Sequence, residues 1–244
     1  MNALAKNSWT EAWGELGRAL PRPRAVLAIS AHWYAPGVAV TADASPRTIH
    51  DFGGFPEPLS AVEYPAPGSP ELARRVQRLL APLQVELDSS WGLDHGTWSV
   101  LCHVYPGADV PVVQFRIDES RPPDAHYELG RRLGQLRDEG ILILGSGNLV
   151  HNLRAWARGG RGQAPYEWAA RFESEARRWM LAGNDAELVD YERLGPDALR
   201  SIPTPEHYLP LLYVLGARDP GETVTFPVEG VDGGSISMLA VRVG

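Results

Sequence analysis

The sequence has almost no cysteine, since Cys102 is the only one among its 244 residues. A single thiol excludes an internal disulfide framework and a cysteine-rich zinc site, and it favours a reducing cytoplasm as the compartment. Any metal that the protein binds must therefore be held by histidine or carboxylate side chains.

Long apolar runs and clusters of basic residues are also lacking. No run reaches the roughly 18 apolar residues that a membrane-spanning helix needs, and residues 1–20 have the pattern of an amphipathic helix, not of a signal peptide. The formal net charge is −7, and no cluster of Lys and Arg stands out that would neutralise a run of phosphates. We expect a soluble, cytoplasmic protein that binds neither nucleic acid nor membranes and whose partner is a small molecule.

Several catalytic signatures are absent as well. The sequence has no Walker A motif, no Gly-x-Gly-x-x-Gly between a strand and a helix, and no His-Glu-x-x-His. Gly145-Ser146-Gly147 does not match the Gly-x-Ser-x-Gly turn that carries a nucleophilic serine. A serine hydrolase therefore has little support.

What is present suits one compact α/β domain. Apolar side chains make up 44% of the chain and include 8 Trp, which is enough for a substantial core. Capping signals and periodicity predict helices at residues 9–20, 70–80, 124–139, 166–181 and 204–215. Apolar runs and alternation predict strands at residues 25–30, 110–117, 141–144, 223–227 and 235–243. This order predicts a mixed, largely parallel sheet flanked by helices, with residues 48–70 as a long ordered loop or an active-site lid.

Two of the seven histidines follow strands that are expected to be buried on both faces. His32 comes just after the strand at 25–30, and His151 comes shortly after the strand at 141–144. In open α/β sheets, ligands bind outside the carboxyl ends of the strands. These two positions are candidates for a binding site, and the alternative for each is a loop histidine that is hydrogen-bonded to the backbone.

His207 and His95 have weaker signals. His207 is expected in the first turn of a helix, where the helix dipole keeps an imidazole neutral, as a metal requires. The alternative, which the isolated Pro-Glu-His sequence favours, is a capping or exposed histidine. Neighbouring Glu206 is a possible ligand, but on a helix only one of the two side chains would face the site. Asp94 precedes His95, and it either orients the imidazole for acid/base work or only caps the following helix. The residues alone thus indicate a mononuclear site made largely of histidines.

The remaining histidines carry less chemistry. His50 lies in an aromatic, glycine-rich loop and is a candidate for substrate contact, with a surface position as the alternative. His103 follows an apolar stretch and is expected to pack in the core. His126 has no chemical neighbour in the sequence, and no role is expected for it.

At these residues the chain resembles the 4,5-DOPA extradiol dioxygenases, a branch of the class III, LigB-type ring-opening enzymes. The resemblance runs nearly end to end, and the matching segments include Ser30-Ala31-His32-Trp33, residues 48–56, residues 64–70, residues 91–96, residues 145–153 and residues 203–212. It implies a LigB-like fold and an enzyme that opens the ring of a catechol, such as a DOPA-like diol, with O₂ to give a semialdehyde.

The resemblance also implies roles for single residues. It implies a non-haem Fe(II) with His32 and His207 as ligands, His207 standing where class III enzymes usually have a carboxylate. His151 matches an acid/base histidine beside the metal that is described as a ligand in some members, and His95 matches a second catalytic histidine. An all-histidine site would suit zinc as well. Trp33, Phe52 and His50 are expected near the substrate, with core packing as the alternative for the two aromatic residues.

The start of the chain differs from the family pattern. Members begin with a short buried strand and a Gly-His-Gly-Ser-Pro-Met-Asn segment whose histidine is the first metal ligand, whereas this sequence opens at Met1-Asn2-Ala3-Leu4. We expect a single catalytic domain over residues 1–244 that lacks this segment, with a start codon further upstream. The alternative is a truncated, catalytically weak or inactive protein that binds a metal or ligand on the same fold.

Overall fold

The computed structural model of the protein describes residues 2–51, 53, 57–160 and 162–244. The strands in these ranges are β1 (Ala25–Ala35), β2 (Val38–Thr41), β3 (Val85–Asp88), β4 (Val112–Asp118), β5 (Ile141–Ser146), β6 (Val224–Val228), β7 (Val231–Asp232), β8 (Ile236–Ser237) and β9 (Ala240–Val243). The α-helices are α1 (Ser8–Ala19), α2 (Glu57–Ser60), α3 (Pro70–Leu79), α4 (His95–Val104), α5 (Pro123–Leu133), α6 (Leu153–Gly159), α7 (Glu167–Ala182), α8 (Asp185–Val189), α9 (Pro196–Ser201) and α10 (Leu209–Gly216). Two 3₁₀ helices, η1 (Gly134–Glu139) and η2 (Tyr191–Arg193), complete these elements.

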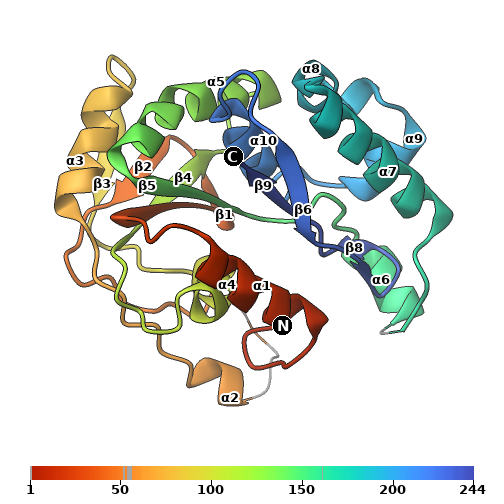
Figure 1. Ribbon diagram of the computed structural model, residues 1–244, viewed down its shortest axis with the longest axis horizontal. Helices are drawn as coiled ribbons and strands as arrows, with labels where there is room; N and C mark the ends of the chain where they lie inside the picture. The colour runs from red at the N-terminus through yellow and green to blue at the C-terminus, as the bar shows by residue number, and fades with distance from the viewer. Residues whose placement is uncertain (1, 52, 54–56, 161) are drawn as a thin grey trace.

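The described strands form one main sheet and two small ribbons. The main sheet has five strands in the order β3-β2-β4-β1-β5, and the ribbons are β6-β9 and β7-β8 (Figure 1). β1 pairs in parallel with β4 and β5, and β2 pairs in parallel with β3, while β2 and β4 are antiparallel. The expected mixed, largely parallel sheet is therefore confirmed.

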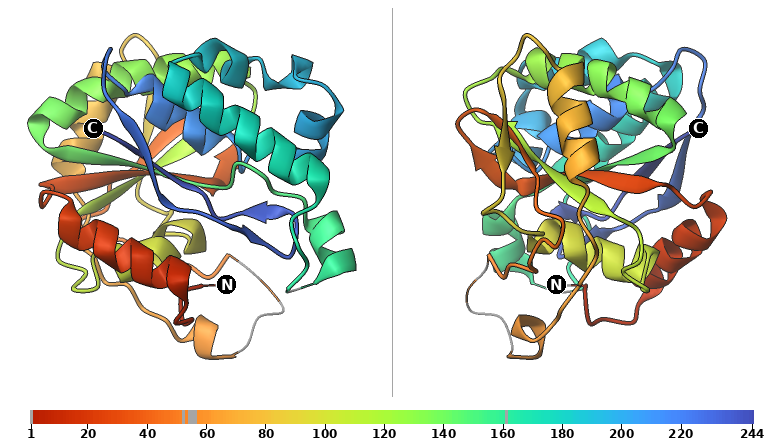
Figure 2. Two further views of the ribbon diagram at one scale, coloured as in Figure 1. Left: turned by 45° about the vertical axis from the view of Figure 1, so that its right-hand side comes forward. Right: turned by 90° about the vertical axis from the view of Figure 1, so that its left-hand side faces the viewer.

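Helices cover both faces of the sheet (Figure 2). Because successive strand residues point to opposite faces, Leu27 and Ile29 of β1 enter a core with α3, α5, α7 and α10. Val26 and Ala28 point the other way, into a second core with Trp98 and Leu101 of α4. The central strand is thus buried on both faces, as its continuous apolar sequence predicts.

The structure corrects three expected boundaries. β1 runs on to Ala35, so His32 and Trp33 lie within the strand, beyond a register irregularity after Ile29. The helix expected at 124–139 becomes α5 followed by the 3₁₀ helix η1, which ends at Gly140 in a left-handed conformation. The helix expected from residue 204 begins only at Leu209, because residues 206–208 form a turn.

The strand expected at 141–144 forms, but it is less buried than expected. Ile141 is buried, whereas the other five residues of β5 are half-buried. The physical reason is position, because β5 is the edge strand of the main sheet and one of its two edges has no strand beside it among the described residues.

Several elements had no clear signal in the sequence. β2 and β3 have four residues each, which is too short to show a period. α4 begins at His95 with Asp94 as its N-cap, whose side chain accepts from the Thr97 N–H at 3.0 Å. Capping is one of the two roles that the sequence left open for Asp94. None of the described helices is long and apolar enough to cross a membrane.

His126 has a structural role that the sequence did not show. Its ring is fully buried between α5 and α10, with Nε2 at 3.2 Å from the Arg121 carbonyl and Nδ1 at 2.8 Å from the Tyr213 hydroxyl. Because a carbonyl only accepts, Nε2 carries the proton and Nδ1 accepts from Tyr213. Burial lowers the pKa of His126 from 6.5 to about 4.

We predict that His126→Gln flattens the dependence of stability on pH. The folded protein keeps His126 neutral, so the stability that it contributes is full above pH 6.5 and is lost as the pH falls from 6.5 towards 4. The free energy of unfolding, measured with urea, should fall between pH 7 and pH 5 by about 2 kcal/mol less in the variant than in the wild type. His103→Gln, which alters a half-buried histidine, is the control, and a variant with an unchanged slope would contradict this account.

Candidate metal centre

Four histidines meet at the carboxyl ends of β1 and β5. The ring centroids of His32 and His95 are 3.8 Å apart, those of His32 and His207 are 5.1 Å apart, and those of His151 and His207 are 3.5 Å apart in a stacked pair. The residues come from β1, the start of α4, the loop after β5 and the turn before α10. The sequence predicted this edge for His32 and His151, and the fold adds His95 and His207 to it.

His32 lies over a buried polar network. The Ser30 hydroxyl donates to Asp94 at 2.8 Å, and the Ser30 oxygen lies 3.2 Å from the His32 backbone nitrogen. Gln114 also hydrogen-bonds to Asp94. Burial raises the pKa of Asp94 to about 6, against the opposing effect of the Ser30 hydrogen bond. Gly96 permits the close approach, because a Cβ there would lie 2.8 Å from the His32 ring.

Asp51 orients His95. One carboxylate oxygen accepts from the His95 backbone N–H at 2.9 Å, and the other lies 2.9 Å from His95 Nδ1. A carboxylate only accepts hydrogen bonds, so Nδ1 carries the proton of His95 and Nε2 is the unprotonated nitrogen. Burial would raise the pKa of Asp51, but the hydrogen bonds from His95 outweigh it and hold that pKa below its ordinary value. Asp51 therefore stays ionised beside His95.

Asn148 orients His207 in a similar way. Its amide nitrogen donates to the Ser237 carbonyl at 2.8 Å, which directs its oxygen to His207 Nδ1 at 3.2 Å. His207 therefore carries its proton on Nδ1 and has a free lone pair on Nε2. The backbones are also close, since a Cβ on Gly147 would lie 2.1 Å from the His207 carbonyl oxygen. The turn that carries His207 packs directly on the Gly-Ser-Gly-Asn segment, which is why this segment has a glycine at 147 and an asparagine at 148.

His151 is placed by its backbone. Its N–H donates to the Ser201 carbonyl at 2.8 Å, and it forms an isolated antiparallel bridge with Ile236. The ring is then free to stack on His207. Its position depends on α9 and on the C-terminal ribbon, which lie far from it in the sequence.

Burial keeps three of these imidazoles neutral. It lowers the pKa of His32 to about 4, with the neighbouring His95 adding to the effect. Burial also lowers the pKa of His151, and it holds the pKa of His207 well below 6.5, where His151 contributes further. A neutral imidazole is the form that binds a metal.

The donor atoms fit a metal ion. Ligand atoms of His151, Glu206 and His207 all lie within 4.8 Å of one another, and so do those of His32, Asp51 and His95. Glu206 reaches the site together with His207 because both lie in a turn, so the expectation that only one of them faces the site was wrong. Neutral imidazoles with one or two carboxylates are a donor set that suits divalent iron or zinc.

The family model for the catalytic LigB subunit of aromatic ring-opening dioxygenase matches residues 5–232. This chain belongs to the LigB family. The expected fold family and enzyme class are both confirmed: the chain is an extradiol, ring-opening dioxygenase, acting on an aromatic compound and O₂.

Curated LigB relatives agree with this assignment. The chain is 52% identical over 248 residues to a 4,5-DOPA dioxygenase extradiol of Escherichia coli (strain K12), covering 100% of this chain and 91% of that protein. It is 40% identical over 219 residues to the Beta vulgaris protein of the same name, covering 88% and 81% of the two chains. The crystal structure of an uncharacterized Escherichia coli K12 protein matches with a TM-score of 0.86 and 46% identity, over 99% of this chain and 94% of that one.

The other expected site residues of this LigB enzyme have mixed positions. Trp33 is only 4% exposed, and its ring stacks on Trp91 with centroids 5.3 Å apart. This position matches core packing, the alternative to substrate contact. His50 lies 5.5 Å from the Trp98 ring and donates from Nε2 to the Val62 carbonyl at 3.0 Å. Phe52 lies outside the described residues. Substrate contact by all three stays a prediction.

Sequence reasoning missed Asp51 and Asn148 as site residues. Asn148 lies within the segment that carries the family resemblance, and Asp51 follows His50 directly. The signal for each was proximity to a histidine in the sequence. Asn148 in fact contacts His207, which lies 59 positions away, and Asp51 contacts His95, which lies 44 positions away.

We predict that Asn148→Ala weakens metal binding by about 10- to 100-fold, because His207 loses the acceptor that fixes its tautomer and orientation. Anaerobic titration with Fe(II) or Zn(II) measures the affinity.

Asn152→Ala is the matched control for this loop. Asn152 caps α6 by accepting from the Ala155 N–H at 2.9 Å. Its loss should cost about 1 kcal/mol of stability and leave metal affinity unchanged. Equal metal affinity in wild type and Asn148→Ala would contradict the assigned role.

Proposed function

We propose that this LigB enzyme opens the ring of a DOPA-like catechol with O₂ to a semialdehyde, using a non-haem Fe(II). The observation that carries the proposal is the cluster of His32, His95, His151 and His207, three of them held neutral by burial. The catechol is inferred from relatives that are named for 4,5-DOPA.

We assign the metal to His32, His151 and His207. His207 directs Nε2 to the metal because its Nδ1–H is hydrogen-bonded to Asn148. The ring of His151 stacks on the ring of His207. Glu206 supplies a carboxylate in the same group of ligand atoms. Two histidines and a carboxylate favour Fe(II), whereas the purely histidine set would also accept zinc in a purified sample. Bound Fe(II) would supply open coordination positions at which an aromatic diol and O₂ react.

His95 is the proposed acid/base residue. It contacts His32 but is fixed by Asp51, whose ionised carboxylate accepts a hydrogen bond from its Nδ1–H. This arrangement suits a group that takes a proton from a catechol hydroxyl and returns it during ring opening. His151 is the second candidate for this role, because it is both a possible ligand and a neighbour of the reacting centre.

The surroundings of the cluster suit an aromatic substrate. Residues 48–51 bring His50 and Asp51 to the start of α4, and Trp98 lies against His50. We propose that His50, Trp33 and Phe52 contribute to the substrate side of the site. The protein's part in the reaction is to position the diol and to exclude water.

Oxygen uptake tests the proposal. Protein loaded anaerobically with Fe(II) and freed of excess metal is mixed with oxygenated DOPA, and both oxygen consumption and the absorbance of a yellow product are followed. We expect turnover that depends on Fe(II). His95→Gln should reduce kcat by about 100-fold or more, because general acid–base catalysis contributes at that level, while its metal content stays at the wild-type value.

His103→Gln, in the last turn of α4, is the control and should turn over as the wild type does. Stoichiometric metal without oxygen uptake from any catechol would refute catalysis and support a non-catalytic metal- or ligand-binding protein on this fold. Failure to hold Fe(II) or Zn(II) at all would refute the metal centre itself.

A further inference from the structure

Ser237 of β8 is hydrogen-bonded to the loop after β5 through both groups of its backbone. Its N–H donates to the Val150 carbonyl at 2.9 Å, and its carbonyl accepts from the Asn148 side-chain nitrogen at 2.8 Å. Ser237 is only 1% exposed, so water does not compete for these groups. The residue therefore fixes the side-chain amide of Asn148, whose oxygen accepts from His207.

The hydroxyl of Ser237 joins the same strand to α7. It accepts from the Leu239 N–H at 3.2 Å and donates to Glu173 Oε2 at 2.6 Å. Within the described ranges, this hydroxyl is the one hydrogen-bond donor to the Glu173 carboxylate, which is half-buried. Burial raises the pKa of Glu173, so a carboxylate at this position carries a desolvation cost. What the carboxylate holds is therefore a better explanation for its position than solvation is.

Three hydrogen bonds in series connect α7 with His207. The Nδ1–H of His207 donates to Asn148, the Asn148 amide donates to the Ser237 carbonyl, and the Ser237 hydroxyl donates to Glu173. Carbonyl and carboxylate oxygens only accept, so every proton in the series points away from His207 and towards Glu173. The series therefore permits one tautomer of His207, with the proton on Nδ1.

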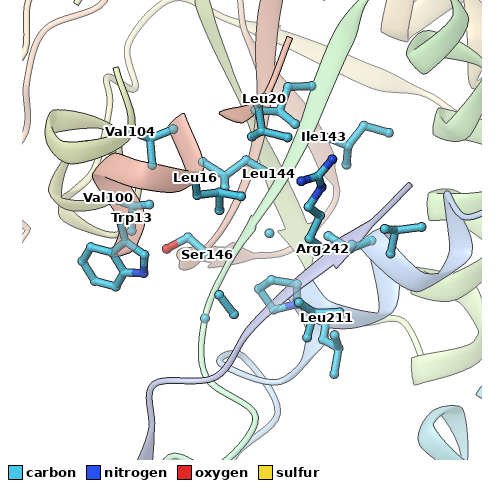
Figure 3. A pocket seen from close by; sticks show the side chains of 18 of the residues that line it. Trp13, Leu16, Leu20, Val100, Val104, Ile143, Leu144, Ser146, Leu211 and Arg242 are labelled. Carbon is cyan, nitrogen blue, oxygen red and sulfur yellow. The ribbon is translucent and has the colours of Figure 1, made fainter. Parts of the chain in front are cut away.

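Apolar side chains lie beside this series of hydrogen bonds. Leu144 of β5 and Leu211 of α10 line the same cavity as Asn148 and His207, and Figure 3 shows both leucines among the side chains around it. An apolar side chain neither donates nor accepts, so neither leucine can take the place of a hydrogen bond that is lost. The tautomer of His207 thus depends on the bonds that end at Glu173.

We propose that Glu173 is a positioning residue for the metal centre, holding His207 through Ser237 and Asn148 in the tautomer that presents Nε2. The inference rests on the proposed function, in which His207 is a metal ligand. Glu173 acts by fixing β8 against α7, which places the Ser237 carbonyl where the Asn148 amide reaches it. Partners of this kind, outside the ligand shell, orient metal-binding histidines and affect metal affinity.

Two variants of Glu173 test the role of its hydrogen bond. Glu173→Leu keeps a side chain of similar size but removes the acceptor, whereas Glu173→Gln keeps an acceptor oxygen for the Ser237 hydroxyl. Anaerobic titration with Fe(II) or Zn(II) should show about fivefold weaker binding for Glu173→Leu, the equivalent of one hydrogen bond. Glu173→Gln should bind within about twofold of the wild type. Equal affinity in the Leu variant and the wild type would overturn the proposal.

The Asn148→Ala background separates positioning from stability. Asn148→Ala breaks the series between Ser237 and His207, so Glu173→Leu should cause no further loss of metal affinity in that background. The midpoint of urea unfolding should fall by the same amount in both backgrounds. An equal loss of metal affinity in both backgrounds would mean that Glu173 does not act through Asn148, and it would contradict the proposal.

A second readout uses the metal-free protein. NMR of protein labelled with ¹⁵N-histidine reports the tautomer of His207, whose signals are identified by their absence in His207→Gln. The fraction with the proton on Nδ1 should fall in Glu173→Leu and stay at the wild-type value in Glu173→Gln. An unchanged tautomer in protein that holds stoichiometric metal would refute this inference alone. A changed tautomer in protein that binds no metal would refute the metal centre and uphold the link from Glu173 to His207.

Arg177→Gln is the matched control. Arg177 lies one turn further along α7 and pairs with Glu229, just before β7, at 2.7 Å. This ion pair joins α7 to the same C-terminal segment without touching Ser237, so its loss should leave metal affinity and the His207 tautomer unchanged. A loss of affinity as large as that in Glu173→Leu would mean that any loosening of α7 disturbs the site, and the specific link would be wrong.

Discussion

The removal of water from a cluster of imidazoles is the physical constraint on which the site depends. Packed this closely, protonated rings would repel one another, and burial adds a second penalty for the charged form. His32, His151 and His207 are therefore held neutral, with His32 titrating only near pH 4. Polar neighbours fix the tautomers, since Asp51 accepts a hydrogen bond from Nδ1–H of His95 and Asn148 accepts one from Nδ1–H of His207. The result is a set of nitrogen lone pairs that a divalent metal can use.

The fold supplies this cluster by bringing several backbones unusually close together. β1 and β5 lie side by side in parallel, so their carboxyl ends open at one edge. Gly96 lets the start of α4 approach the ring of His32, and Gly147 lets the turn before α10 approach the loop after β5.

Local sequence signals were enough for part of this arrangement. The periodicity of α1, the Ser69 cap of α3 and the apolar runs of β1, β4 and β5 predicted those elements, although α1 is capped by Asn7 with Thr10 and not by Ser8 with Glu11. The positions of His32 and His151 after strands predicted a site at the carboxyl edge. The turn at His207 was not predictable, because it depends on packing against Gly147 and on the hydrogen bond to Asn148. The roles of Asp51 and of His126 were hidden for the same reason, since Asp51 acts on α4 and His126 binds Tyr213 of α10. The periodicity of a sequence indicates which side chains of a segment are buried, but it does not indicate which distant segment will contact or hydrogen-bond to them.

Anomalous diffraction at the iron edge from crystals of the Fe(II)-loaded protein tests the central claim most directly. The account predicts a single iron peak within bonding distance of the Nε2 atoms of His32, His151 and His207, with His95 held away from the metal by Asp51. A peak bound instead among His32, Asp51 and His95, or no peak in fully loaded protein, would contradict it.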